Sequence, residues 1–132
     1  MQNRVQLQRE RNQGFGAAAM LLRLMQIYSQ FEGNRSLGCE RTRPANILGR
    51  QLLKSGTSIG ANYREAVRAE SRNDFIHKLG ICEKEAAETE YWIELFAESR
   101  LARTEICGTL LKECRELIAI VVASSRTAKS RL

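Results

Sequence analysis

Five basic side chains at helical spacing are the residues of this sequence best suited to binding a ligand by charge. They are Arg50, Lys54, Arg64, Arg68 and Arg72, and we call them the basic stripe. Steps of four residues keep side chains on one side of a helix, so Arg72 shares that side only if the helix persists past Ala69. Because arginine offers a planar fork of donors that fits a phosphate, the stripe indicates binding to RNA or DNA backbones.

The basic stripe also fits two roles that involve no nucleic acid. The first is a solvated helix face whose local ion pairs each contribute only about 0.3–0.5 kcal/mol. The second is pairing between copies of the chain. Residues 41–72 hold seven basic and two acidic residues, whereas residues 83–98 hold six glutamates and one lysine. The basic segment of one copy can therefore meet the acidic segment of the next, in a contact that can close into a ring.

The same segment carries two glycines one helical turn apart. Each of Gly56 and Gly60 costs a helix roughly 0.5–1 kcal/mol relative to alanine, so the pair needs a structural reason. Since glycine has no Cβ, another helix can approach closely there. Ser55, Ser58 and Asn62 place polar atoms in or beside the apolar side. We expect a tight helix crossing with a satisfied polar layer, or a contact with a ligand or RNA at the glycines.

Residue types that support catalysis or metal binding are sparse. The single histidine, His77, has no nucleophile motif near it and follows no glutamate at the Glu-x-x-His spacing of di-iron bundles. The sequence has no Walker-type phosphate loop and no Cys-x-x-Cys pair. We therefore expect a protein that is not an enzyme and that holds no cofactor or metal. Cys82, Cys107 and Cys114 fall on apolar stripes and should be buried, while Cys39 should be exposed.

The elements that must position these residues are helices. Phe75, Leu79, Cys82, Ala86, Thr89, Ile93 and Phe96 repeat at alternating steps of four and three. Similar apolar stripes, proline at position 44 and a Ser71-x-x-Asp74 cap predict helices at about 15–32, 44–69, 72–100 and 104–124. Residues 1–13 read as a polar tail and 126–132 as a basic tail. The fold class is all-α: one domain over residues 14–125, an antiparallel up-down four-helix bundle.

The composition agrees with a globular chain of one domain. The 132 residues are 43% hydrophobic and 27% charged, with a net charge of +6. No apolar run approaches the roughly 20 residues of a membrane span, and the N-terminal segment lacks the pattern of a signal peptide. We expect a cytoplasmic protein with no membrane contact.

Two blocks of the sequence resemble a known family. Residues 50–66 (RQLLKSGTSIGANYREA) and the helix from DFIHKL at position 74 to EYWIEL at position 90 are similar to the four-helix-bundle proteins encoded in 23S rRNA intervening sequences of bacteria. The likeness extends over residues 47–101 and brings no catalytic residues with it.

The resemblance also implies partners for the chain. A functional analogue is the accessory protein of diversity-generating retroelements, a pentameric ring of bundles that binds a reverse transcriptase and nucleic acid. It implies a homo-oligomer, possible contact with RNA or DNA, and possible contact with a nucleic-acid enzyme. The alternative is a purely structural or regulatory protein-binding oligomer without a nucleic-acid role.

Overall fold

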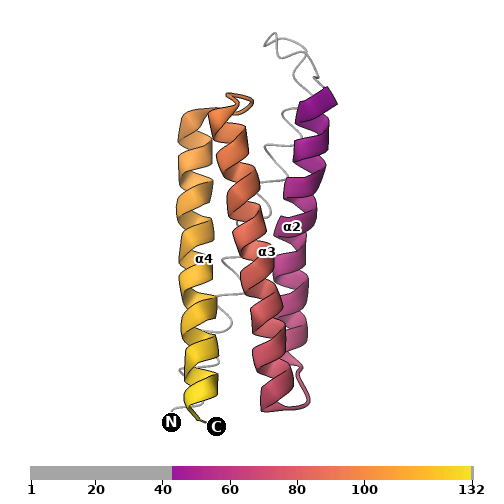
Figure 1. Ribbon diagram of the computed structural model, residues 1–132, viewed down its shortest axis with the longest axis vertical. Helices are drawn as coiled ribbons and strands as arrows, with labels where there is room; N and C mark the ends of the chain where they lie inside the picture. The colour runs from indigo at the N-terminus through magenta and orange to yellow at the C-terminus, as the bar shows by residue number, and fades with distance from the viewer. Residues whose placement is uncertain (1–42, 132) are drawn as a thin grey trace.

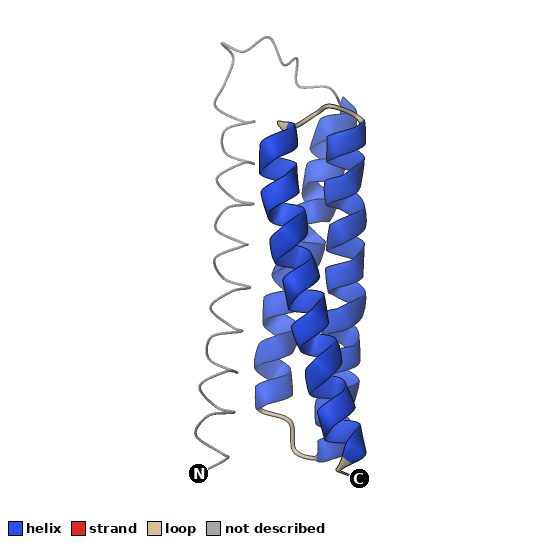
Figure 2. Ribbon diagram, turned by 90° about the vertical axis from the view of Figure 1, so that its left-hand side faces the viewer, coloured by secondary structure: helices blue, strands red, loops and turns tan. Residues whose placement is uncertain are grey.

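The computed structural model describes residues 43–131, which form three long helices. They are α2 (Arg43–Val67), α3 (Arg72–Glu98) and α4 (Thr104–Ser130). Consecutive helices run in opposite directions, and α3 packs against both of the others (Figure 1). Short loops join them at alternate ends (Figure 2). The described part of the chain is therefore all-α, while the predicted helix 15–32 and the tail 1–13 lie outside the described residues.

Local signals at the helix ends explain where α3 begins and stops. Ser71 is extended, and its side chain accepts a hydrogen bond from the backbone N–H of Asp74 at 3.1 Å, which confirms the predicted cap. At the other end Arg100 takes a left-handed conformation with φ of 56°. The N–H of Leu101 then reaches back to the carbonyl of Phe96, a bond that closes the helix.

The carboxyl end of the chain differs from the expected basic tail. Helix α4 continues to Ser130, so residues 126–130 are helical. Ser125 is buried and Ala128 is half-buried, which shows that the packed side of α4 extends past Val121. The guanidinium of Arg72 donates a hydrogen bond to the backbone carbonyl of Arg131. This contact provides a partner for one of the carbonyl groups that a helix end otherwise leaves unpaired.

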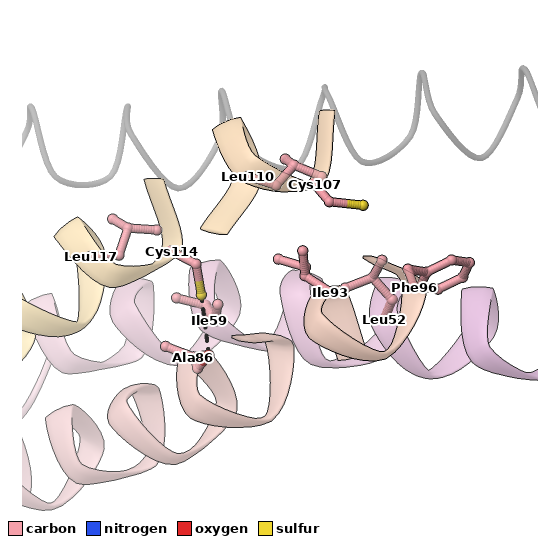
Figure 3. Packing of buried hydrophobic residues seen from close by; sticks show 9 residues of the cluster. All are labelled: Leu52, Ile59, Ala86, Ile93, Phe96, Cys107, Leu110, Cys114 and Leu117. Atoms are coloured by element: carbon pink, nitrogen blue, oxygen red, sulfur yellow. Dashed lines mark hydrogen bonds between the residues drawn. The ribbon is translucent and has the colours of Figure 1, made fainter. Parts of the chain in front are cut away.

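The core lies along the line where the three helices meet. Its larger cluster takes residues from α2, α3 and α4 (Figure 3): Leu52, Ile59, Ala86, Ile93, Phe96, Cys107, Leu110, Cys114 and Leu117. A smaller cluster of Ala66, Leu79, Cys82 and Val121 lies toward the α2–α3 turn. The predicted seam of α3 is buried except for Phe75, which is half-buried. The heptad-like spacing thus identified the packed side of this helix.

A small polar layer crosses the core between α2 and α3. Thr89 Oγ1 lies 3.0 Å from Ser55 Oγ, and Ser55 donates to the carbonyl of Leu52 at 3.2 Å. Both side chains are at most 1% exposed. Thr89 also donates to the carbonyl of Glu85 at 2.7 Å, so each buried hydroxyl has an acceptor within its own helix. The layer places Ser55 of α2 level with Thr89 of α3.

Candidate nucleic-acid interface

The outer side of α2 presents three members of the basic stripe. Arg50, Lys54 and Arg64 are exposed, and so are Thr57 and Ala61 between them. At 3.6 residues per turn, the three basic residues fall within an arc of about 80°. The centre of that arc is opposite Ile59, which is only 2% exposed. The helix therefore directs these charges away from the core.

The other two members of the stripe lie beyond α2. Because this helix ends at Val67, Arg68 falls in the turn and Arg72 begins α3. The helix does not persist past Ala69, so Arg72 does not share a helical side with the other members of the stripe. Both side chains are exposed, and Arg72 bonds to the end of α4 as described above. Three members of the stripe thus lie on α2, Arg68 lies in the turn, and Arg72 contacts the end of α4.

The charges of the stripe are not used up by ion pairs in the described part of the chain. Within residues 43–131, Arg50, Lys54, Arg64 and Arg68 each lie beyond ion-pair distance of every carboxylate. Glu65, the acidic residue nearest in sequence, pairs with Lys78 instead. The hydrogen bond to Glu65 raises the pKa of Lys78. Four exposed cations are therefore left without a carboxylate partner by the part of the chain that the structure describes.

The outer side of α3 carries the opposite charge. Glu83, Glu88 and Glu98 are exposed along it. Two further glutamates are held by Arg115 of α4, with Nε 2.6 Å from Glu90 and Nη2 3.2 Å from Glu94. The hydrogen bond to Glu90 raises the pKa of Arg115. Part of the acidic charge predicted to face another copy is thus neutralised within the chain.

An aromatic side chain stands among these acids. Tyr91 is 53% exposed, opposite the buried seam of α3. Its ring contacts Trp92 edge-on, with the centroids 4.9 Å apart. The indole N–H of Trp92, a half-buried residue beside the seam, donates to Glu88 at 3.1 Å and so has a hydrogen-bond partner. The outer side of α3 thus combines an exposed phenol with free and paired carboxylates.

The glycine segment of α2 lies on its packed side. Gly56 is buried, and Gly60 and Asn62 are half-buried. The side-chain amide of Asn62 donates to the carbonyl of Ser58 at 2.8 Å, so this polar group is satisfied within its own helix. Helix α2 runs through both glycines without interruption. Close approach of another helix at Gly56 and Gly60 stays a prediction.

The three described cysteines are buried, as their spacing predicted, and Cys39 lies outside the described residues. Burial raises the pKa of Cys82 to about 11 and that of Cys114 to about 12, and it also raises the pKa of Cys107. These thiols are therefore protonated near neutral pH and are poor nucleophiles. His77 is exposed. Across residues 43–131, no three His, Cys, Asp or Glu side chains are grouped to hold a metal ion.

Sequence reasoning missed the contribution of α4 to the basic surface. Arg126, Lys129 and Arg131 are exposed on its last turns, and the Arg72–Arg131 bond joins them to the α2–α3 turn. The signal that could have identified them is the spacing of Val121, Ser125 and Ala128, which continues the packed side in steps of four and three. Taking the serine-rich end as a tail hid this pattern.

None of the three described helices is long and apolar enough to cross a membrane.

No curated protein matches the chain. A crystal structure of a protein of unknown function from the S23 ribosomal protein family of Bacteroides thetaiotaomicron is 30% identical in sequence, with a TM-score of 0.75. The match covers 89% of this chain and 97% of that one. The model of the 23S rRNA-intervening sequence proteins matches residues 39–123, and it includes both sequence blocks described above. The chain therefore belongs to the 23S rRNA-intervening sequence protein family.

Proposed function

We propose that this chain is a non-enzymatic, self-associating protein of the cytoplasm that binds nucleic acid, or a nucleic-acid enzyme, through its basic stripe. In this proposal residues 15–32 supply the fourth helix of the bundle. The observation that carries the proposal is the exposure of Arg50, Lys54, Arg64 and Arg68 without a carboxylate partner within residues 43–131. The membership of the chain in a family of proteins encoded within rRNA genes is consistent with an RNA partner.

The chemistry of the stripe favours contact with the phosphate backbone over reading of bases. Guanidinium and ammonium groups bind phosphate oxygens, and these contacts carry no sequence information. Tyr63, the only aromatic residue of α2, is half-buried, so a stacking surface for bases is lacking on this helix. Neutralising about four phosphates gives a plot of log affinity against log salt with a slope of roughly −3 to −4.

The experiment is a salt titration of binding to short RNA and DNA duplexes by the wild type and by Arg64→Gln with Arg68→Gln. We expect the double variant to reduce the magnitude of the slope by about two. A matched control is Arg103→Gln with Lys112→Gln, which removes two exposed charges near the start of α4 and should leave the slope unchanged. An unchanged slope in the Arg64 and Arg68 variant, with assembly intact, would contradict nucleic-acid binding by this face.

The second candidate is a structural or regulatory oligomer that uses the stripe to contact protein. The observation that favours it is the outer side of α3, where exposed Glu83 and Glu98 flank Tyr91. A ring of copies, with a pentamer as the size implied by the resembled accessory protein, could pair this side with α2 of the next copy. Sedimentation of the Arg64 and Arg68 variant separates the candidates. If it falls apart into monomers, these arginines belong to the subunit contact.

A further inference from the structure

One end of the described bundle gathers basic residues that are far apart in the sequence. The α2–α3 turn and the helix ends beside it contribute Arg64, Arg68 and Arg72, and the end of α4 contributes Arg126, Lys129 and Arg131. Figure 1 shows the α2–α3 turn and the end of α4 at the same end of the bundle. The hydrogen bond from the Arg72 guanidinium to the Arg131 carbonyl brings the two groups into contact across 59 residues. We call these six exposed residues the basic end.

Acidic residues do little to neutralise the basic end. Glu65 is occupied by Lys78, so that pair cancels. Asp74 is half-buried in the first turn of α3, and one of its oxygens lies 3.4 Å from the backbone N–H of Glu70. Glu70 is the remaining acid between Val67 and Lys78, and residues 121–131 contain none. Among residues 43–131, six cations at this end therefore face two carboxylates, those of Glu70 and Asp74.

Helix electrostatics alone do not account for this accumulation. Helices α2 and α4 both end here, and one cation in a last turn favours the negative end of a helix dipole by about 0.3–1 kcal/mol. Arg64 and Lys129 already occupy those two last turns. Arg68 and Arg131 directly follow these helix ends, and Arg72 bonds the Arg131 carbonyl. Two helix ends supply only about one negative charge together, so six cations exceed what the dipoles balance and repel one another. An anionic partner would relieve this repulsion.

We infer that the basic end is a binding surface for the backbone of double-stranded nucleic acid, with Arg126 and Lys129 of α4 as binding residues beside Arg64 and Arg68. This inference rests on the proposed function and deepens it. A duplex presents one charge per roughly 1.7 Å of axis, about twice the density of one strand. None of the six residues is aromatic, so stacking of unpaired bases on them would depend on arginine guanidinium planes alone. A group of cations without an aromatic side chain fits a duplex better than a single strand.

The test compares two variants of the full chain that remove equal charge from opposite ends of α4, one of them including its N-cap residue Arg103. Arg126→Gln with Lys129→Gln changes the basic end, and Arg103→Gln with Lys112→Gln changes exposed positions near the opposite end of α4. Binding to short RNA and DNA duplexes, and to the matching single strands, is measured over a range of salt. We expect the first variant to lose about two units of slope and on the order of tenfold in affinity at low salt. The second should bind like the wild type, and duplexes should bind more tightly than single strands.

A charge-conserving variant keeps the test independent of folding. Arg126→Lys with Lys129→Arg should bind like the wild type. If these side chains had a structural role instead, binding would be weakened both in this variant and in the variant with two glutamines. Thermal unfolding and sedimentation of every variant accompany the titrations.

The outcomes separate the inference from the proposed function. If the Arg126 and Lys129 variant keeps the wild-type slope while the Arg64 and Arg68 variant loses two units, the inference is wrong and the proposed function stands. Tighter binding of single strands than of duplexes also overturns the inference. If the wild type binds no nucleic acid but binds vesicles rich in phosphatidylserine, both proposals are wrong and the surface serves an anionic membrane.

Discussion

Cys82, Cys107 and Cys114 lie where helices meet, and two of their sulfurs have specific partners on the neighbouring helix. Cys82 Sγ lies 3.7 Å from the carbonyl of Ile59, and Cys114 Sγ lies 3.2 Å from the carbonyl of Ala86. An S–H group donates weakly, so each contact favours the protonated thiol. Burial acts in the same direction and is the main cause of the raised pKa of each cysteine. These residues therefore behave as small core side chains.

The raised thiol pKa values predict a loss of stability at alkaline pH. The folded chain retains a proton that the unfolded chain releases near pH 9, so this contribution is complete below pH 9 and decreases as pH rises toward 11 or 12. Each thiol contributes at most about 1.4 kcal/mol per pH unit. We would measure the free energy of unfolding in urea between pH 8 and 11 for the wild type and for Cys82→Ala with Cys114→Ala. This free energy should decrease less steeply with rising pH in the variant.

Reaction with a thiol reagent provides an independent check of the same burial. We expect all three cysteines to be modified slowly in the native protein and rapidly after unfolding, because access to the sulfur limits the rate. Rapid native labelling of all three would show that the packed sides of α3 and α4 are assigned incorrectly.

Some residue contacts could be predicted from the sequence and others could not. The cysteines were placed correctly because burial follows from the spacing of apolar residues along a single helix. The bridge from Arg115 to Glu90 and Glu94 joins residues 25 and 21 positions apart. It depends on the level at which α4 packs against α3, which the spacing within either helix does not determine.

At the scale of elements, the two kinds of glycine in these helices give opposite predictions. A Cβ added at Gly80 or Gly108 would have open space, with nothing within 4 Å. Gly56 is buried and Gly60 half-buried on the packed side of α2. We predict that Gly60→Leu destabilises the bundle by about 1–3 kcal/mol through overpacking. As controls, Gly80→Ala and Gly108→Ala should each stabilise it by roughly 0.5–1 kcal/mol, because alanine favours a helix. Thermal unfolding measures all three, and a Gly60→Leu variant that melts like the wild type would refute the close crossing.

The helix ends show where local sequence signals succeed and fail. The cap of α3 was predictable because Ser71 and Asp74 interact within one turn. The end of α4 was predicted too early, because its basic composition indicated a tail although the spacing of its packed side continues to Ala128. The residue at which it stops also depends on a tertiary contact, the bond from Arg72 to its final carbonyl. Helix propensity and composition are weak guides when tertiary contacts decide where a helix stops.

At the scale of the whole molecule, alternating apolar spacing was sufficient to predict helices packed side by side. The structure adds which residues of neighbouring helices lie side by side, and this determines where charged residues of different helices come together. Leu52 and Phe96 belong to one core cluster, so the start of α2 lies beside the end of α3. Arg50 and Glu98 are therefore at the same end of the molecule, on the outer sides of adjacent helices. The basic end lies opposite, and its composition could not be predicted because it joins α4 to the α2–α3 turn.

This separation leads to a prediction for self-association. If copies pair α2 of one with α3 of the next, Arg50 meets the region of Glu98 in the neighbour, while Arg126 and Lys129 of the basic end stay available for nucleic acid. We expect the wild type to sediment at micromolar concentration as a multiple of its 15.0 kDa mass. Arg50→Glu and Glu98→Arg should each shift the population toward monomer, because like charges would face each other across the contact.

Mixing those two variants provides the sharpest measurement of this contact. In the mixture the acidic α3 of the Arg50→Glu chain again meets a basic α2, and the two reversed residues meet each other as opposite charges. Assembly should therefore recover in part relative to either variant alone, because a ring with an odd number of copies keeps at least one mismatched contact. Glu116→Arg, an exposed reversal on α4, serves as the control and should leave assembly unchanged. A wild type that remains monomeric would exclude self-association. An oligomer insensitive to both reversals would show that its copies meet through a different face, leaving the outer sides of α2 and α3 open to other partners.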